Sequence, residues 1–289
     1  MAAQLQLLRL SHVNALVDGY RRSLDHLGGT LGMQVNMEIP AREGDDTDAC
    51  LLSLGDVIFE LFAPRQRAER GQGRLLALYG GHYLGAEFQV PDLDAARSVC
   101  RSRNVRIIRD DGYAFFTYPG ACSGISWEIF DGDWHSPPHG GTAGDVVTNP
   151  DWTPIHTAAY WRDEHPLGVV GLARLGVAVA DLDAALEGFQ SLTGAAEIDR
   201  PSRPEAKAID LQVGDTVFEL LAPAGDGPLA EWLTRYREGV RSTVFRVHDL
   251  DRVERFAADR GIDLVPGDAS DAWAFSPEQS LDLRFEFTE

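Results

Sequence analysis

The sequence predicts an α+β protein made of four βαβββ repeats, and three observations carry this prediction. Two stretches read almost alike, residues 55–64 (GDVIFELFAP) and residues 214–223 (GDTVFELLAP). They lie about half a chain length apart, which indicates a duplication within the 289 residues. The pattern Val-x-Asp-Leu-Asp also recurs, beginning at Val90, Val179 and Val247. Each copy is typical of a strand that ends where an acid-capped helix begins.

The first half, residues 1–131, is expected to hold two repeats, at residues 8–64 and 82–131. A helix at 19–27 should end at Gly28-Gly29, and residues 64–81 read as a linker. A second helix should open at Asp92 and run to about residue 103. The strands predicted by short apolar runs between turn signals are 8–17, 35–39, 49–54, 57–64, 86–90, 105–108, 114–118 and 125–130.

A connection follows at residues 132–168, rich in proline, histidine and tryptophan. Its aromatic content predicts that it lies against the protein surface rather than forming a free linker. The second half, residues 169–289, should hold two further repeats, at 171–223 and 241–288. Strands are expected at 172–179, 216–223, 242–247 and 283–287, with helices opening at Asp181 and Asp249.

The overall composition excludes several classes of partner. A formal charge of -19 argues against binding to nucleic acid or to anionic membrane surfaces. No apolar run approaches the roughly 20 residues of a membrane span, and the chain start lacks signal-peptide features. The three cysteines lack metal-site spacing and read as free thiols. We therefore expect a cytoplasmic protein with a small-molecule ligand, as a monomer or homodimer.

Single carboxylates within apolar strands point toward a site. Glu60 and Glu219 occupy the middle of the two similar stretches, where both strand faces read as apolar. Glu128 and Glu286 occupy the matching strands of the second and fourth repeats. A buried carboxylate without a partner costs several kcal/mol, so each of these needs a metal, a cation or a hydrogen-bond donor.

These strand-end, helix-start and Glu-Leu-x-x-Pro signals, taken in order, resemble the vicinal oxygen chelate superfamily. That superfamily includes glyoxalase I, extradiol dioxygenases and the bleomycin-resistance proteins. The resemblance covers nearly the whole chain apart from the connection. It implies two glyoxalase-like cup-shaped domains, each formed by a pair of βαβββ repeats. It also implies metal ligands from the first and fourth strands of each repeat.

Mapped onto this chain, the resemblance implies His12, Glu60 and Glu128 as metal ligands in the first half. The first-strand position of the second repeat holds Gly85, where the family often has a histidine. His82 could complete the set only if a bulge turned its strand face. Glu87 shares the face of Gly85 without distortion. Glu87 and His82 are therefore the candidates to complete the ligand set, and Glu60 and Glu87 are also the candidates for moving a proton.

The second half lacks a histidine at these positions. Arg174 stands where His12 stands in the first half, and Ser242 stands at the position of Gly85. We expect Arg174 to take the place of a metal by pairing with Glu219 and Glu286, because a guanidinium offers a fixed charge and five donors. Ser242 and Arg284 are the competitors: the first has a short side chain, and the second shares a strand face with Glu286.

Two functions of different classes remain open at this point. The first is a metal-dependent lyase, isomerase or dioxygenase that chelates two neighbouring oxygens of a small oxygenated metabolite, aromatic ones included, in the amino-terminal domain. One histidine with carboxylates suits Fe(II), Mn(II), Zn(II) or Ni(II). The alternative is a metal-free binding or drug-sequestration protein of the bleomycin-resistance type. The missing histidines favour the alternative, whereas His12 with Glu128 favours the enzyme, and Trp127 is a candidate to line the cup.

Overall fold

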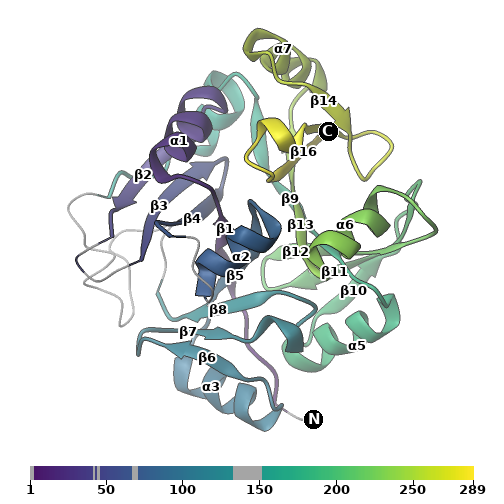
Figure 1. Ribbon diagram of the computed structural model, residues 1–289. Helices are drawn as coiled ribbons and strands as arrows, with labels where there is room; N and C mark the ends of the chain where they lie inside the picture. Colours follow the sequence, from purple (N-terminus) through teal and green to yellow (C-terminus); the bar gives the residue numbers. More distant parts are fainter. Residues whose placement is uncertain (1–2, 42, 44–45, 67–70, 133–151) are drawn as a thin grey trace. The chain divides into compact units, whose positions relative to one another are not determined.

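Four βαβββ repeats are present in the computed structural model, which describes residues 3–41, 43, 46–66, 71–132 and 152–289 (Figure 1). The first repeat consists of β1 Arg9–Leu16, α1 Tyr20–Leu24, a π-helix Asp25–Thr30, β2 Gln34–Ile39, β3 Thr47–Leu54 and β4 Val57–Pro64. The second consists of β5 His82–Gln89, α3 Leu93–Ser102, β6 Ile107–Asp110, β7 Ala114–Thr117, a 3-10 helix Pro119–Ala121 and β8 Ser126–Phe130, preceded by α2 Gly71–Tyr79.

The second half repeats this arrangement. The third repeat consists of β9 Val169–Ala178, α5 Leu182–Thr193, β10 Ala196–Asp199, β11 Ala206–Val213 and β12 Thr216–Pro223. The fourth consists of β13 Gly239–Val247, α7 Leu250–Arg260, β14 Leu264–Pro266, β15 Trp273–Phe275, a 3-10 helix Pro277–Gln279 and β16 Arg284–Thr288, preceded by α6 Pro228–Tyr236.

The strands form two eight-stranded sheets with the same order. The first sheet runs β2-β3-β4-β1-β5-β8-β7-β6 and the second runs β10-β11-β12-β9-β13-β16-β15-β14. Each repeat contributes four strands, with its first strand beside its fourth. In the second repeat, β5 and β8 are parallel neighbours. The predicted α+β fold of four paired βαβββ repeats is confirmed.

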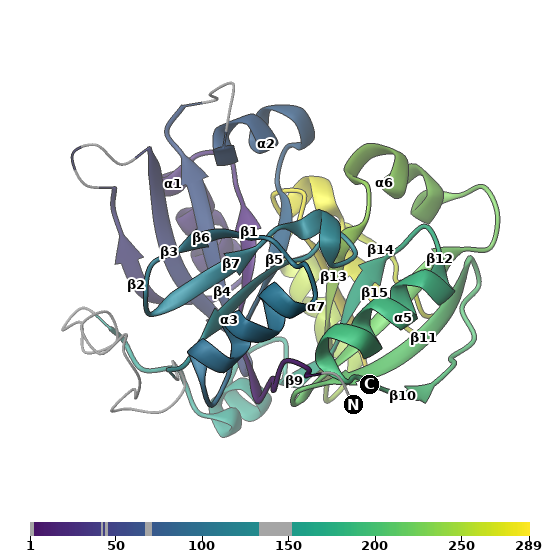
Figure 2. The same ribbon diagram turned by 90° about the horizontal axis from the view of Figure 1, so that it is seen from below.

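Aspartate caps hold the helices where the sequence predicts them. The carboxylate of Asp92 accepts a hydrogen bond from the amide of Ala95 at 2.8 Å. Asp181 caps α5 and Asp249 caps α7 in the same way. These caps satisfy amides that have no partner inside the helix. α3 then packs against β8, and α5 packs against β11 and β12 (Figure 2).

Two local predictions are wrong. The predicted linker at 64–81 contains the helix α2, which buries Leu76. The predicted stop at Gly28-Gly29 lies inside the π-helix Asp25–Thr30, which continues α1. Both errors involve glycines inside a helical turn, where the tertiary context overrides a weak intrinsic preference.

Backbone contacts group the chain into two compact units. Unit 1 comprises Met1–Val13, Leu84–Trp152 and Leu175–Val240, and unit 2 comprises Asn14–Tyr83, Thr153–Arg174 and Arg241–Glu289. The core of unit 1 is aromatic and includes Phe88, Trp127, Phe189 and Phe218. In unit 2, the ring of Phe59 packs against those of Phe245 and Phe285. The domain boundaries at 131 and 169 stay a prediction.

The described part of the connection is anchored in unit 2. Trp161, in the π-helix Tyr160–Glu164, is buried, and its ring centroid lies 4.9 Å from that of His165. Nε2 of His165 lies 3.1 Å from the carbonyl oxygen of Gly32. Trp134, His135 and His139, considered with the connection, lie outside the described residues.

Candidate metal centre

The pairing of β5 with β8 brings two carboxylates together. In this parallel pair Glu87 stands opposite Glu128, and Gly85 stands opposite Ser126. Side chains of opposite residues point to the same face of a sheet, so the two carboxylates share one face. The exposed fractions of Glu87 and Glu128 are 2% and 6%. Two buried like charges on adjacent strands need a compensating group.

The other face of the same strands forms the aromatic core of unit 1. The rings of Phe88 and Trp127 lie 5.5 Å apart, and Trp127 stacks on Phe218 at 5.7 Å with an interplanar angle of 9°. Trp127 alternates with Glu128 along β8, so it lies opposite the carboxylates. The expectation that Trp127 lines the cup is therefore wrong: its ring packs against Phe88 and Phe218 on the opposite face of the sheet.

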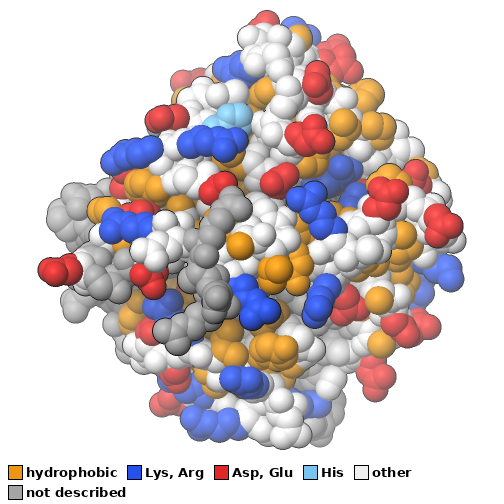
Figure 3. Space-filling view, viewed as in Figure 1, with side chains coloured by type: hydrophobic (Ala, Val, Ile, Leu, Met, Phe, Trp, Pro, Cys, Tyr) orange, Lys and Arg blue, Asp and Glu red, His pale blue; other side chains and the backbone are white. Residues whose placement is uncertain are grey.

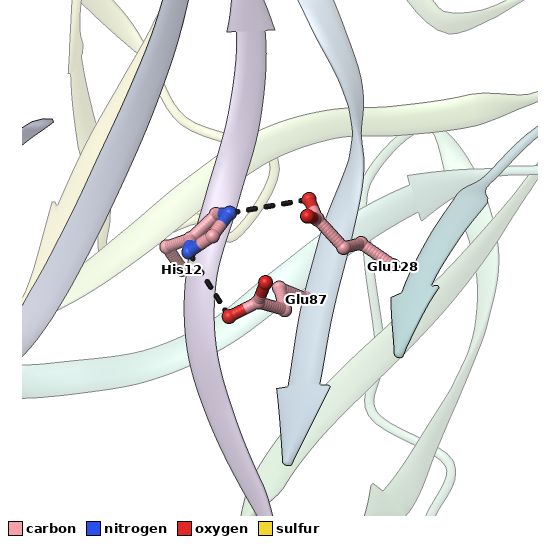
Figure 4. A group of neighbouring side chains, drawn as sticks. All are labelled: His12, Glu87 and Glu128. Atoms are coloured by element: carbon pink, nitrogen blue, oxygen red, sulfur yellow. Dashed lines mark hydrogen bonds and ion pairs between the residues drawn. The ribbon is translucent and has the colours of Figure 1, made fainter. Parts of the chain in front are cut away.

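His12 brings a third ligating side chain to the two glutamates (Figure 4). It lies on β1, the neighbour of β5 in the sheet, and is 2% exposed. Its Nδ1 lies 3.3 Å from Oε1 of Glu87, and its Nε2 lies 3.3 Å from Oε2 of Glu128. One ligating atom from each residue lies within 4.8 Å of the others.

The donor set fits a divalent metal. One imidazole nitrogen and two carboxylate oxygens are ligands for Fe(II), Mn(II) and Zn(II). A 2+ ion would balance the two carboxylates, and three protein ligands would leave coordination positions for a substrate. Within the described part of the chain, these residues form the one group of three or more such side chains with this spacing.

The chain was compared with protein families, curated proteins and solved structures, and only solved structures gave matches. No protein-family model matches the chain, and no curated protein matches it. Among solved structures, a mutant of 4-hydroxymandelate synthase from Streptomyces coelicolor aligns with a TM-score of 0.72 at 14% identity. The alignment covers 97% of this chain and 92% of that one.

Two further solved structures also align over nearly the whole of this chain. The 2,3-dioxygenase LapB from Pseudomonas sp. KL28 aligns with a TM-score of 0.58 at 12% identity, covering 99% of this chain and 93% of that one. A fusion of a xylose isomerase-like TIM barrel with 4-hydroxyphenylpyruvate dioxygenase aligns at 0.64 and 14%, covering 99% of this chain and 49% of that one. The protein has the vicinal oxygen chelate fold, in its two-domain form.

Gly85 shows why this group of side chains contains only one histidine. A Cβ atom built on Gly85 would lie 1.8 Å from the carbonyl oxygen of Ser126. The backbones of β5 and β8 approach too closely there for any side chain. The side chain on that face that joins His12 and Glu128 is instead Glu87, two residues further along β5.

Glu60 and His82, the other predicted ligands, are not members of the three-residue group. Glu60 lies on β4, partly buried, and its charge adds to the burial that raises the pKa of Cys50. Nδ1 of His82 lies 2.9 Å from the carbonyl oxygen of Gly80, and its ring meets that of Tyr79 edge-on. Burial lowers the pKa of His82. Their roles as ligands, and that of Glu60 in proton transfer, stay predictions.

In the second sheet, arginines contact the carboxylates at the corresponding strands. Nε of Arg203 donates to Glu219 at 2.6 Å, from the segment between β10 and β11. Nε of Arg284 donates to Glu286 at 2.6 Å. For Glu286 the predicted role of Arg174 is wrong: the guanidinium comes from two residues earlier on the same strand face. Arg203 was missed because nothing in its loop signals a buried contact.

Asp268 completes a charged cluster around Glu286. It receives two hydrogen bonds from Arg241, both at 3.0 Å, and its own amide donates to Glu286 at 2.9 Å. Burial and the charge of Asp268 raise the pKa of Glu286, whereas burial of Asp268 is outweighed by Arg241 and Arg284, which lower its pKa. Two arginines thus balance two carboxylates, so this cluster needs no metal.

The surface carries both signs of charge. On the face in Figure 3, Lys and Arg side chains stand among Asp and Glu side chains, so no continuous acidic field covers that face. Among the described residues, no helix is long and apolar enough to cross a membrane.

Proposed function

We propose that this protein is a metal-dependent enzyme whose ion is held by His12, Glu87 and Glu128. The observation that carries the proposal is the convergence of three buried ligating atoms within 4.8 Å. The substrate would be a small oxygenated metabolite that binds through two neighbouring oxygens. Since two of the solved structures with this fold are named as dioxygenases, Fe(II) and oxygen chemistry are the favoured combination. Lyase and isomerase reactions are the alternatives within the same scheme.

The bound ion would act as a Lewis acid that polarises the substrate oxygens. The protein residues orient the site. The 3.3 Å contacts from His12 fix the plane of its ring, one nitrogen toward each glutamate. His12, Glu87 and Glu128 would each offer one ligating atom to the ion, and their mutual contacts orient the three side chains toward one another. The deep burial of all three side chains keeps water from competing.

The second candidate is a metal-free binding protein. One observation favours it: His12 already contacts both carboxylates, so a protonated imidazole would balance part of their charge without an ion. This arrangement would leave the cup as a ligand pocket with no catalytic centre.

Metal content separates the two candidates. The purified protein would be stripped with a chelator, reconstituted with Fe(II) under anaerobic conditions or with Mn(II), and its metal measured by elemental analysis. About one ion per chain is expected, and His12→Ala or Glu87→Gln should abolish retention. His156→Ala, which removes an exposed histidine, is the matched control and should retain the ion. Retention near zero in the unaltered protein would favour the binding protein.

A further inference from the structure

A single row of side chains crosses the second repeat from the candidate metal centre to the sheet edge. Glu87 stands opposite Glu128 in the β5–β8 pair, and Glu128 stands opposite Phe116 in the β8–β7 pair. Phe116 in turn stands opposite Arg109 in the β7–β6 pair. Opposite residues share a face, so Arg109 projects from the same face as the two glutamates. β6 is the edge strand of this sheet.

Contacts on two sides fix the position of Arg109. Its guanidinium lies over the ring of Phe116, 5.3 Å from the centroid, which is cation–π geometry. Its Nε lies 2.7 Å from Oδ2 of Asp111. The arginine side chain is 60% exposed. Among the described residues, Nη1 and Nη2 have no hydrogen-bond partner, so a fork of N–H donors remains for a ligand.

The guanidinium of Arg109 interacts electrostatically with Glu128 of the candidate metal centre. Partial burial opposes its charge, but Asp111, Tyr113 and Glu128 outweigh this and raise the pKa of Arg109. The exposed pair with Asp111 contributes little stability, so an incoming anion can share the arginine without a large cost. The same hairpin carries a second arginine–aromatic pair. The guanidinium of Arg106 lies over the ring of Tyr118, 5.8 Å from its centroid. Arginine and aromatic rings therefore flank the acidic centre.

We propose that Arg109 determines specificity by binding a carboxylate of the substrate. The inference rests on the proposed function and narrows its substrate to small oxygenated molecules that carry a carboxylate remote from the chelating oxygens. Neighbouring strands lie about 4.8 Å apart, so the backbones of Glu128 and Arg109 are separated by roughly 10 Å. A carboxylate matches the arginine fork with two parallel hydrogen bonds, while Phe116 supports the rest of the molecule.

The test uses a matched pair of chelating probes, 3-(3,4-dihydroxyphenyl)propanoate and its methyl ester. Both present the same vicinal oxygens, and only the first carries a charge at the far end. Binding to the Mn(II)-loaded protein would be measured anaerobically by calorimetry. The acid is expected to bind at least about tenfold more tightly than the ester.

Substitutions then assign the preference to one side chain. Arg109→Gln should reduce the acid-to-ester ratio to about one, with affinity for the ester unchanged, and Arg109→Lys should keep part of it. Arg101→Gln removes an exposed charge on α3 and should leave the ratio as in the unaltered protein. Because Arg109 is exposed, its substitution should leave the thermal unfolding temperature nearly unchanged.

The outcomes separate this inference from the proposed function. A protein that retains no Mn(II) contradicts the proposed function, and the inference falls with it. A protein that retains Mn(II) but binds acid and ester equally, or binds neither, overturns the assignment of Arg109 alone. A preference for the acid that survives Arg109→Gln overturns it as well.

Discussion

At the scale of single residues, the three-residue group differs from the set that the resemblance implies at Gly85 and at Glu60, and sterics explain the difference at Gly85. The resemblance places a ligand at Gly85, but a Cβ there would meet the carbonyl oxygen of Ser126. The alternation of side chains along a strand was enough to select Glu87 as a replacement. His12 and Glu128 followed from their strand positions, and the structure brings all three together.

Arg109 could not be predicted from the sequence, because its face depends on the strand register. The β6–β7 pairing shifts between Ile107 and Arg109. A shift of one residue turns every following side chain to the other face of the sheet. Nothing in the sequence of this short hairpin reveals that shift, so the arginine appeared to be one surface charge among many.

The close approach at Gly85 predicts an unusual cost for a small substitution. Gly85→Ala should lower the free energy of unfolding by about 2–3 kcal/mol or more, because the backbone of β8 must move. Urea unfolding measures this. Gly188→Ala is the control: Gly188 lies in α5 with no atom within 4 Å of a built Cβ, so this change should stabilise by up to about 1 kcal/mol. Similar effects for the two variants would refute the steric explanation.

His12 should also matter to stability when no metal is bound. In chelator-treated protein, His12→Ala leaves Glu87 and Glu128 buried together and should cost roughly 3–5 kcal/mol. Adding Glu87→Gln to that variant should recover part of the loss, since one charge is removed. Denaturant unfolding of the single and double variants gives both values. A loss under about 0.5 kcal/mol for His12→Ala would mean that the contacts of His12 with the two glutamates do not stabilise the fold.

At the scale of elements, the strands and the aspartate-capped helices were predictable because their signals are local. Asp92 precedes α3 and accepts a hydrogen bond from its first turn, as the sequence pattern indicates. The helix α2 and the π-helix at 25–30 were not predictable, since glycines favour turns when considered alone. Leu76 is buried at its place in α2, and that tertiary contact decides the conformation.

The described part of the connection, through His165, predicts that the stability of the fold depends on pH. Burial lowers the pKa of His165 to about 4, below its ordinary value of 6.5. The unfolded chain therefore binds a proton at higher pH than the folded one, and stability is complete above about pH 6.5. It should fall as the pH drops toward 4, by about 3 kcal/mol in total. The groups that act on His165 are Gly32, Arg260, Arg252 and His156.

Urea unfolding at pH 7, 5.5 and 4.5 measures this loss. His165→Gln, which cannot be protonated, should show a smaller decrease over the same range than the unaltered protein. His248→Ala serves as the control, because His248 is exposed and is not among the groups that act on His165, so its removal should leave the decrease in place. Equal slopes for His165→Gln and the unaltered protein would assign the pH dependence to other groups.

At the scale of the whole molecule, the two sheets share one strand order but differ in chemistry. The first sheet gathers His12 with two glutamates, whereas the second pairs Glu219 and Glu286 with arginines. The lack of a histidine at the matching positions of the second half made this asymmetry predictable. Arg284 was named only as a competitor of Arg174 for Glu286. Arg203 was not predictable, because it comes from a loop, and Asp268 has no counterpart in the sequence pattern.

The central claim is that the three residues on β1, β5 and β8 hold one divalent ion. Anomalous diffraction from crystals grown with Zn(II), a redox-inert substitute, tests it most directly. The account predicts one strong anomalous peak about 2.0–2.2 Å from a ring nitrogen of His12 and from a carboxylate oxygen of Glu87 and of Glu128. A peak bound only by other residues, or none at this place at full zinc saturation, would contradict the account.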